Sequence, residues 1–378
     1  MRRLRYIHQL PDWPDFRWDD AQLAVPLAAA RNRQGLLLGR MAALGFPLRQ
    51  EATLETLTEE VVRSSAIEGE TLPSNDVRSS IARGLGLDAG GAGPADRHIE
   101  GIVEMMLDAT GAYDRPLTEE RLFGWHAALF PTGRSGMHRI RTGAWRGDET
   151  GEMQVVSGPL GRERVHYEAP PAGRVPDEMR RFLTWFERPS GQDPVLRAGL
   201  AHLWFVTIHP FADGNGRIAR AVAEMALARS ERSAQRYYSM SSQIMAERAA
   251  YYDTLERTQK GTMDVTAWMS WFLACLARAI YAADGRLGGV LQKARFWQAL
   301  AGESMNQRQR RMLNLLLEGF DGKLTTSKWA TITKTSTDTA LRDITDLVER
   351  GVLTRGEGGG RSVNYVLADA PSGLSASG

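Results

Sequence analysis

Cysteine is almost absent from this sequence of 378 residues, with Cys275 as its one representative. A single cysteine cannot close an internal disulfide, and its apolar surroundings favour a buried thiol in a reducing compartment. A long hydrophobic run is also missing, because Ser270 and Arg278 interrupt the most apolar stretch, 267–283. A membrane span needs about 18 uninterrupted apolar residues, and the basic N-terminus lacks the apolar segment of a secretory signal. We therefore expect a soluble, cytoplasmic protein without a membrane partner.

An excess of one charge is lacking as well, since 47 Lys and Arg balance 45 Asp and Glu for a formal net charge of +2. A nearly neutral chain is not a general binder of nucleic acid or of anionic membranes, although a local basic patch remains open. Only five of the basic residues are lysines. Arginine binds phosphate through two donors, but coding bias explains this skew more simply. At roughly 100–200 residues per domain, the length suggests two or three domains.

Helical periodicity dominates the sequence and predicts a mainly α fold. The predicted helices cover residues 23–46, 54–67, 76–87, 95–113, 118–130, 176–187, 194–208, 216–230, 246–260 and 266–286. A glycine-rich stretch, 87–94, is expected to form a flexible loop. Alternating apolar residues predict two hairpins, one at 153–168 and a smaller one at 351–367.

Three more predicted helices, 307–318, 326–334 and 336–350, precede the smaller hairpin and complete the pattern of a winged helix-turn-helix. The third would be the helix that reads DNA, but it carries four acidic residues against two arginines. Helices that read DNA are usually basic enough to approach phosphates. DNA is therefore a possible but disfavoured partner, and a three-helix packing or dimerisation module is the alternative.

The densest chemical signal is a glycine-rich loop between two predicted helices, His209-Pro210-Phe211-Ala212-Asp213-Gly214-Asn215-Gly216-Arg217-Ile218-Ala219-Arg220. Gly214 and Gly216 lack a Cβ, so backbone N–H groups can turn inward and form an anion-binding concavity. The helix that follows adds free N–H groups and the positive end of its dipole. Arg217 and Arg220 project from one face near the same helix end. Together these features suit an oligophosphate better than a single carboxylate.

Two other side chains of the loop could act on a bound phosphate chain. Asp213 can hold Mg²⁺, which prefers oxygen ligands and shares them with phosphates, and His209 can take up a proton near neutral pH. Each feature alone is weak, because such histidines and Gly-Asn-Gly turns commonly have structural roles. Together they complete the pattern His-x-Phe-x-(Asp/Glu)-Gly-Asn-Gly-Arg-x-x-Arg. A chance match to its eight specified positions has a probability on the order of 10⁻⁸ to 10⁻⁷.

This pattern is the signature of the Fic family, and the chain resembles those enzymes. Most Fic proteins transfer AMP from ATP to a hydroxyl of a target protein. The resemblance implies the same activity here, on a Ser, Thr or Tyr of a target and on the protein itself. It implies that His209 deprotonates the hydroxyl, which attacks the α-phosphate as pyrophosphate leaves. It also implies that Asp213 coordinates Mg²⁺ between the α- and β-phosphates, and that the protein is a homodimer.

The same resemblance assigns the phosphates to the rest of the loop. Asn215 and the backbone of Gly214 and Gly216 would stabilise the charge that develops on the α-phosphate. Arg217 would hold the β-phosphate and Arg220 the γ-phosphate. All the defining positions are intact, so the motif is that of an active enzyme.

The predicted hairpin at 153–168 lies where Fic proteins have a flap that positions the target. Gln154, Val155 and Val156 would dock an extended target segment by strand addition, in which main-chain bonds align the hydroxyl. A plain surface hairpin is the alternative.

Three residues fall where related enzymes build the adenine pocket, namely Tyr252, Leu255 and Gln259. Tyr252 would stack on the base. Gln259 stands where some relatives have Asn, which leaves that contact open, and packing in the core is an equally good interpretation of Leu255.

Ser64-Ser65-Ala66-Ile67-Glu68-Gly69 fits the inhibitory-helix pattern of the same family, (Ser/Thr)-x-x-x-Glu-(Gly/Asn). This short pattern occurs by chance about 0.3 times in such a chain, and a lone helical Glu is usually solvated. With a complete catalytic loop downstream, we predict an inhibitory helix at about 57–69. Glu68 would pair bidentately with Arg220 and occupy the space of the γ-phosphate, and Ser64 is the other inhibitory residue of the pattern. Glu68 could also orient a water against an AMP–protein bond, so removal of AMP is a further hypothesis.

The resemblance extends over nearly the whole chain, because residues 13–18 and 324–353 also look like parts of long bacterial Fic proteins. The expected architecture is an N-terminal helical domain (1–93), a Fic core (94–286), a winged helix-turn-helix (293–368) and a flexible tail (369–378). A different phosphotransferase is disfavoured, since neither a G-x-x-x-x-G-K-(S/T) loop nor the kinase motifs are present. The binding-module alternative is a DNA-binding transcriptional regulator with a vestigial Fic core.

Overall fold

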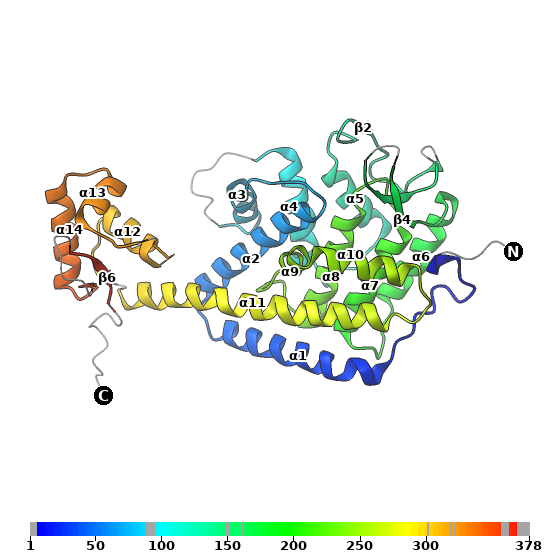
Figure 1. The fold of residues 1–378 in the computed structure, drawn as a ribbon, viewed down its shortest axis with the longest axis horizontal. Helices are drawn as coiled ribbons and strands as arrows, with labels where there is room; N and C mark the ends of the chain where they lie inside the picture. Colours follow the sequence, from blue (N-terminus) through cyan, green and yellow to red (C-terminus); the bar gives the residue numbers. More distant parts are fainter. Residues whose placement is uncertain are drawn as a thin grey trace. The chain divides into compact units, whose positions relative to one another are not determined.

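The protein forms two compact units, Met1–Ala283 and Asp284–Gly378, in a computed structural model that is mainly helical as predicted (Figure 1). The structure describes residues 6–87, 95–148, 151–159, 162–300, 302–317, 319–320, 322–356 and 363–368. Most of the predicted loop at 87–94 and the whole predicted tail at 369–378 lie outside these residues. Among the described helices, none combines the length and the hydropathy that a membrane span requires.

Five helices make up the first part of the larger unit. They are α1 (Asp20–Ala42), α2 (Phe46–Ile67), α3 (Ser74–Gly84), α4 (Arg97–Gly111) and α5 (Glu119–Leu129). The Thr118 side chain accepts a hydrogen bond from the Arg121 backbone and caps α5, as predicted. α2 begins earlier than the predicted residue 54 because Pro47 stands in its first turn, where a missing N–H is tolerated.

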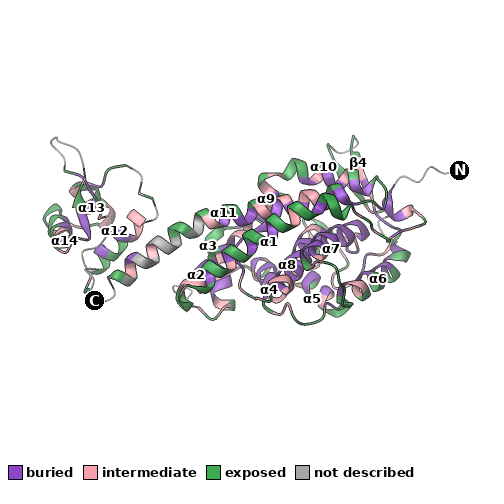
Figure 2. Cartoon of the chain, turned by 90° about the horizontal axis from the view of Figure 1, so that it is seen from below, coloured by how far each residue is buried: buried purple, intermediate pink, exposed green. Residues whose placement is uncertain are grey.

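The centre of this unit is the pair α7 (Pro194–Ile208) and α8 (Asn215–Glu231), joined by the glycine-rich loop. Both helices are almost wholly buried (Figure 2), which explains why α7 is apolar on every face. Around them lie α6 (Val175–Glu187), α9 (Met240–Ala246), α10 (Arg248–Gln259) and α11, which begins at Thr266. The two ends of the glycine-rich loop are therefore attached to two deeply buried helices.

The β structure of the described residues consists of three two-stranded antiparallel hairpins. The predicted flap is present as β3 (Gln154–Ser157) paired with β4 (Arg164–Glu168), with an irregular register between Val155 and Val156. Residues 160 and 161 of its turn lie outside the described residues. A smaller hairpin, β1 (Arg134–Ser135) with β2 (His138–Arg139), was not predicted, because strands of two residues leave no periodicity in the sequence.

Other helical predictions were also wrong in extent, among them the one at 23–46, where α1 runs from Asp20 to Ala42. The prediction at 246–260 covers α10 but misses α9, whose serine-rich sequence obscures the apolar period. The helix predicted to end at 286 continues as α11 to Ala299 in spite of Gly288 and Gly289, each of which costs a helix about 1 kcal/mol relative to Ala.

The smaller unit contains the predicted helix-turn-helix elements. α12 (Gln307–Leu317), α13 (Thr326–Thr333) and α14 (Thr337–Glu349) are followed by β5 (Leu353–Arg355) and β6 (Tyr365–Leu367). Their shared core is built around the fully buried Trp329, Ile344 and Leu347. The glycines predicted for the hairpin turn, 358–360, lie outside the described residues.

Candidate active site

The glycine-rich loop begins at the last turn of α7. His209 caps this helix in the left-handed conformation (φ 52°, ψ 58°), and its N–H donates to the Phe205 carbonyl. Gly214 (φ 78°) precedes α8, and a Cβ there would press on the Phe130 ring. A non-glycine residue in the left-handed region costs free energy and is kept only where its surroundings hold it. The backbone at His209 is therefore held by neighbouring contacts.

Asn215 braces the loop from inside. Its side-chain oxygen accepts the Phe211 N–H at 2.9 Å, and its Nδ2 donates to the Phe211 carbonyl at 2.8 Å. Phe211 is fully buried, and its ring stacks on that of His126 with 4.2 Å between centroids. The sequence assigned Asn215 to the α-phosphate. The contacts that the structure describes for its side chain are instead to the loop itself.

The imidazole of His209 is prepared to accept a proton. Its Nδ1 lies 3.1 Å from the Val206 carbonyl oxygen, which can only accept, so Nδ1 carries the hydrogen and Nε2 keeps its lone pair. Burial lowers the pKa of His209 and the nearby Arg146 lowers it further, against opposing effects of the Val206 carbonyl and of two carboxylates, Glu68 and Asp213. His209 is therefore neutral near pH 7.

Both arginines of the motif are buried at the start of α8 and both are paired with carboxylates. Arg220 Nη2 lies 2.8 Å from Glu68 Oε1, and Arg220 also donates to Ser64 Oγ and to the Ser64 carbonyl. A Cβ on Gly216 would collide with Glu68 Oε1. The Glu68 carboxylate therefore lies directly over the N-terminus of α8, where the sequence predicts a phosphate.

Glu70, which was not predicted from the sequence, pairs with the other arginine. Glu70 Oε2 lies 3.0 Å from Arg217 Nη1, and its second oxygen bonds His98 Nε2. His98 Nδ1 faces the Leu129 carbonyl oxygen at 3.0 Å. Because both ring nitrogens face acceptors, both donate and the ring is cationic. The signal for Glu70 in the sequence is only its place two residues after Glu68.

These contacts shift the pKa values of both partners. The hydrogen bond to Glu70 raises the pKa of His98. Although partial burial opposes it, the hydrogen bond from His98, with Arg217 nearby, lowers the pKa of Glu70. Glu70 is therefore an anion held between two cations.

Asp213 stands at the entrance to α8 and accepts a hydrogen bond from Ser135 Oγ of β1. Among the described residues, no group of three or more His, Cys, Asp or Glu side chains could hold a metal ion. One carboxylate is enough for Mg²⁺ that takes its remaining ligands from phosphates and water. Ser135 was not predicted, because its hairpin was not.

The three residues predicted for the adenine pocket lie on α10 but differ in burial. Leu255 and Gln259 are buried, and Gln259 Nε2 lies 3.3 Å from Thr207 Oγ1. Tyr252 is partly exposed, and the Arg248 guanidinium lies 5.4 Å from the centre of its ring. Of the three, Tyr252 offers an accessible aromatic face.

The predicted docking residues lie on β3. Gln154 and Val156 are exposed, whereas Val155 packs against the buried Tyr6 and Tyr167. Among the described residues β3 pairs only with β4, so the outer edge of β3 offers unpaired main-chain groups.

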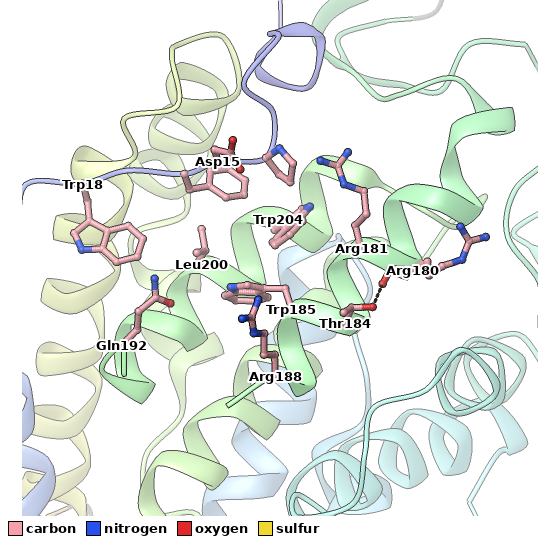
Figure 3. A pocket seen from close by; sticks show the side chains of 12 residues that line it. Asp15, Trp18, Arg180, Arg181, Thr184, Trp185, Arg188, Gln192, Leu200 and Trp204 are labelled. Carbon is pink, nitrogen blue, oxygen red and sulfur yellow. Dashed lines mark hydrogen bonds between the residues drawn. The ribbon is translucent and has the colours of Figure 1, made fainter. Parts of the chain in front are cut away.

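A hollow of about 480 Å³ lies elsewhere, between residues 14–18 and the helices α6 and α7. Figure 3 shows its aromatic lining, in which the Trp185 and Trp204 rings lie 5.1 Å apart between centroids. Arg181 there donates to the Trp13 carbonyl. None of its lining residues belongs to the motif loop, and its lining holds the N-terminal segment against α6 and α7.

Comparison with known proteins gives three matches to family profiles. Residues 116–227 match the Fic/DOC family, residues 6–87 a domain of unknown function (DUF4172), and residues 308–366 a DeoR-like helix-turn-helix domain. The third match agrees with the helix-turn-helix predicted from the sequence.

Two curated relatives match at low identity. A uridine 5'-monophosphate transferase of Xanthomonas campestris pv. campestris (strain 8004) is 30% identical over 122 residues, which are 30% of this chain and 21% of the relative. The protein adenylyltransferase fic-1 of Caenorhabditis elegans is 28% identical over 178 residues, which are 47% of this chain and 32% of the relative. The chain thus spans a third or less of the length of these relatives.

Among solved structures, a Fic family protein from Desulfovibrio desulfuricans G20 aligns with a TM-score of 0.54 at 21% identity. The alignment covers 92% of this chain and 96% of that one. At this identity the likeness shows the fold.

Proposed function

Because residues 116–227 form a Fic/DOC family domain that contains the complete motif loop, we propose that the protein transfers AMP from ATP to a Ser, Thr or Tyr hydroxyl of a target protein and of itself. The observation that carries this proposal is the place of a neutral His209 beside the N-terminus of α8, where Arg217 and Arg220 converge. A base, an anion site and two planar cations are thus brought together by the loop and the start of α8.

His209 Nε2 takes the proton of the attacking hydroxyl. The hydroxyl oxygen forms a bond to the α-phosphorus, the bond from that phosphorus to the bridging oxygen breaks, and pyrophosphate leaves. Asp213 would hold Mg²⁺, which supplies positive charge to the α- and β-phosphates when bound. Asn215 keeps the loop in shape through Phe211. The Gly216 N–H can then bond the α-phosphate, and the Gly214 N–H, which donates to Asp213 Oδ1 in the described conformation, joins it once Asp213 turns to Mg²⁺.

The remaining contacts orient the nucleotide and the target. Arg217 holds the β-phosphate and Arg220 the γ-phosphate through planar donors, and the partly exposed Tyr252 stacks on the base. The free edge of β3 aligns an extended target segment by main-chain hydrogen bonds.

We propose further that the described conformation is an inhibited one. Glu68 and Glu70 occupy the two arginines that the phosphates need. ATP that binds beside Glu68 has its α-phosphate misaligned for attack.

The inhibition is released by a movement of the Glu68 side chain and not by a movement of α2. Glu60 of the same helix is buried, and its carboxylate accepts from Ser239 Oγ at 2.6 Å and from the Ser241 N–H at 3.0 Å. Because a buried carboxylate that loses its partners is costly, α2 stays in place. A rotation of Glu68 at the end of the helix removes the carboxylate from Arg220, while the bonds of Arg220 to Ser64 hold the guanidinium in place.

The proposal is tested by radiolabel transfer. ATP labelled at the α-phosphate marks the protein when AMP is transferred, whereas ATP labelled at the γ-phosphate marks it only when phosphate is. Parallel reactions with α-labelled UTP test the alternative nucleotide that the uridine 5'-monophosphate transferase among the relatives suggests. The wild type is compared with Glu68→Gly, which removes the carboxylate from Arg220. The matched control is Glu55→Gly, because Glu55 is an exposed residue of the same helix. Transfer from UTP alone, or label from the γ-position, contradicts the proposal.

Removal of AMP is a second activity of the same site. With Glu68 in place, its carboxylate orients a water whose oxygen forms a bond to the α-phosphorus. The bond from that phosphorus to the target oxygen breaks, and this oxygen takes up the proton that the water loses, so AMP leaves and the hydroxyl is restored. AMP-modified target is incubated with the wild type and with Glu68→Gly. Release by the wild type alone supports this activity, and release that does not depend on Glu68 rejects it.

DNA binding by the smaller unit is a second candidate function, which the DeoR-like match favours. The acidic character of α14 opposes it less than the sequence suggested, because Asp343 is buried and pairs with Arg308. Filter binding against genomic fragments tests it, and a retained fragment that Arg342→Glu releases supports it. Sedimentation of the same sample tests the homodimer expected from the resemblance.

A further inference from the structure

Arg146 is a buried cation without an ion-pair partner among the described residues. Its exposed fraction is 6%, and it lies in the segment before the flap, outside the motif loop. A buried charge normally needs a partner of opposite charge or a set of hydrogen bonds. The contacts of Arg146 are all to backbone carbonyl oxygens.

These carbonyls belong to two separate parts of the unit. Arg146 Nε donates to the His209 carbonyl at 2.8 Å, and the Arg146 backbone N–H donates to the Pro210 carbonyl at 2.9 Å. Its Nη2 donates to the carbonyl of Pro170, which follows β4 by two residues. One guanidinium therefore bonds both the residue that carries the base and the end of the flap.

The position at the end of α7 explains why the charge is tolerated. His209 is the C-cap of that helix, and the last carbonyls of a helix carry its negative dipole end, which a cation stabilises. The same hydrogen bonds hold His209 in its left-handed conformation, which costs free energy for any residue with a side chain.

We infer that Arg146 is a positioning residue, which holds the His209 imidazole and the target-docking flap at a fixed separation. This inference rests on the proposed AMP transfer. A target hydroxyl held by β3 reaches Nε2 of His209 only if the separation between the flap and the end of α7 is fixed. A misplacement of about 1 Å can lower the rate about 10²-fold.

Arg146 also acts on His209 through its charge. The charged groups that face His209 are Arg146, Glu68 at the end of α2 and Asp213 in the loop, and the Val206 carbonyl bonds its Nδ1. Of these, Arg146 alone lowers the pKa of His209. Removal of this charge is expected to raise the titration midpoint of His209.

The test compares two substitutions in the Glu68→Gly background. Arg146→Gln removes the charge and the double bridge, whereas Arg146→Lys keeps the charge but replaces the two nitrogens of the planar fork by a single ammonium. The matched control is Arg141→Gln, because Arg141 is an exposed cation of the same segment. For each variant the midpoint of His209 is measured by NMR titration, and its signal is assigned by comparison with His209→Ala. The kcat and KM for self-labelling or peptide labelling, the ATP affinity and the thermal unfolding are measured on the same variants.

Arg146→Gln is expected to raise the His209 midpoint and to lower kcat about 10- to 100-fold, with ATP affinity within twofold of the parent. Arg146→Lys keeps the parent midpoint and still loses kcat, and it carries the test if Arg146→Gln does not fold. An unchanged midpoint in Arg146→Gln, or full kcat in Arg146→Lys, overturns the inference. The titration of His209 does not depend on AMP transfer. If the Glu68→Gly parent transfers no AMP but Arg146→Gln still shifts the His209 midpoint, the proposed function is wrong and the effect of Arg146 on His209 stands.

Discussion

Glu68 Oε1 lies 2.8 Å from Arg220 Nη2, at the point where the backbone of Gly216 opens the N-terminus of α8. The carboxylate makes with the arginine the kind of contact that a phosphate oxygen would make. The protein thus carries a carboxylate of its own where the proposed function places a phosphate. Its neighbour Glu70 does the same for Arg217, so that neither motif arginine is free among the described contacts.

Glu70→Gln is expected to increase the affinity for ATP. The change removes the negative charge from Arg217 but keeps the shape of the side chain. Because the Glu70 side chain is 30% exposed, the pair is worth about 0.5–1 kcal/mol, which corresponds to a two- to fivefold tighter Kd. Calorimetric titration with ATP measures it. Glu51→Gln, which breaks the exposed pair with Arg78, is the control and leaves the Kd unchanged, and a weaker Kd in Glu70→Gln contradicts the assignment of Arg217.

The contribution of His98 to stability is expected to depend on pH. The folded protein raises the pKa of His98 above its ordinary 6.5, so the stabilisation is fully present below the unfolded pKa and is lost as pH rises through the folded pKa. The difference in Tm between wild type and His98→Gln should therefore be larger at pH 6 than at pH 8.5. The exposed His138 provides the control, since His138→Gln should show no such trend. A difference in Tm that grows with pH would show that the ring is neutral.

Asn215→Asp is expected to lower AMP transfer by more than its effect on the stability of the fold explains. The aspartate still accepts from the Phe211 N–H, but it cannot donate to the Phe211 carbonyl and repels it. Loss of a buried hydrogen bond costs about 1–3 kcal/mol when it leaves the partner unsatisfied. Urea unfolding measures this loss, and AMP transfer should fall by more than the unfolded fraction accounts for. Asn215→Asp with full transfer would show that the Nδ2 donor is not needed.

The sequence predicted those parts of the site that are local in the chain. The pattern from His209 to Arg220 is one loop and one helix start, and the bounds predicted for α7, 194–208, are those of the structure. The contact of Glu68 with Arg220 could be anticipated because a second motif points to it, whereas the bonds from Arg220 to Ser64 were not predicted.

The residues that were missed depend on contacts between distant segments. Glu70 meets Arg217 across 147 positions, and Arg146 meets the His209 carbonyl across 63. Glu70 and Arg146 lie outside the helices and strands, so no periodicity of the sequence indicates which residues they contact. Asn215 illustrates a different limit, because its motif predicts that it matters but not that its side chain bonds Phe211.

Transfer of label from α-labelled ATP, compared between the wild type and Glu68→Gly, tests the central claim most directly. The protein in which Glu68 no longer occupies Arg220 should label itself at least tenfold faster than the wild type, and His209→Ala should abolish labelling in both backgrounds. Equal labelling by the wild type and Glu68→Gly would contradict inhibition by Glu68, and labelling that survives His209→Ala would contradict His209 as the base.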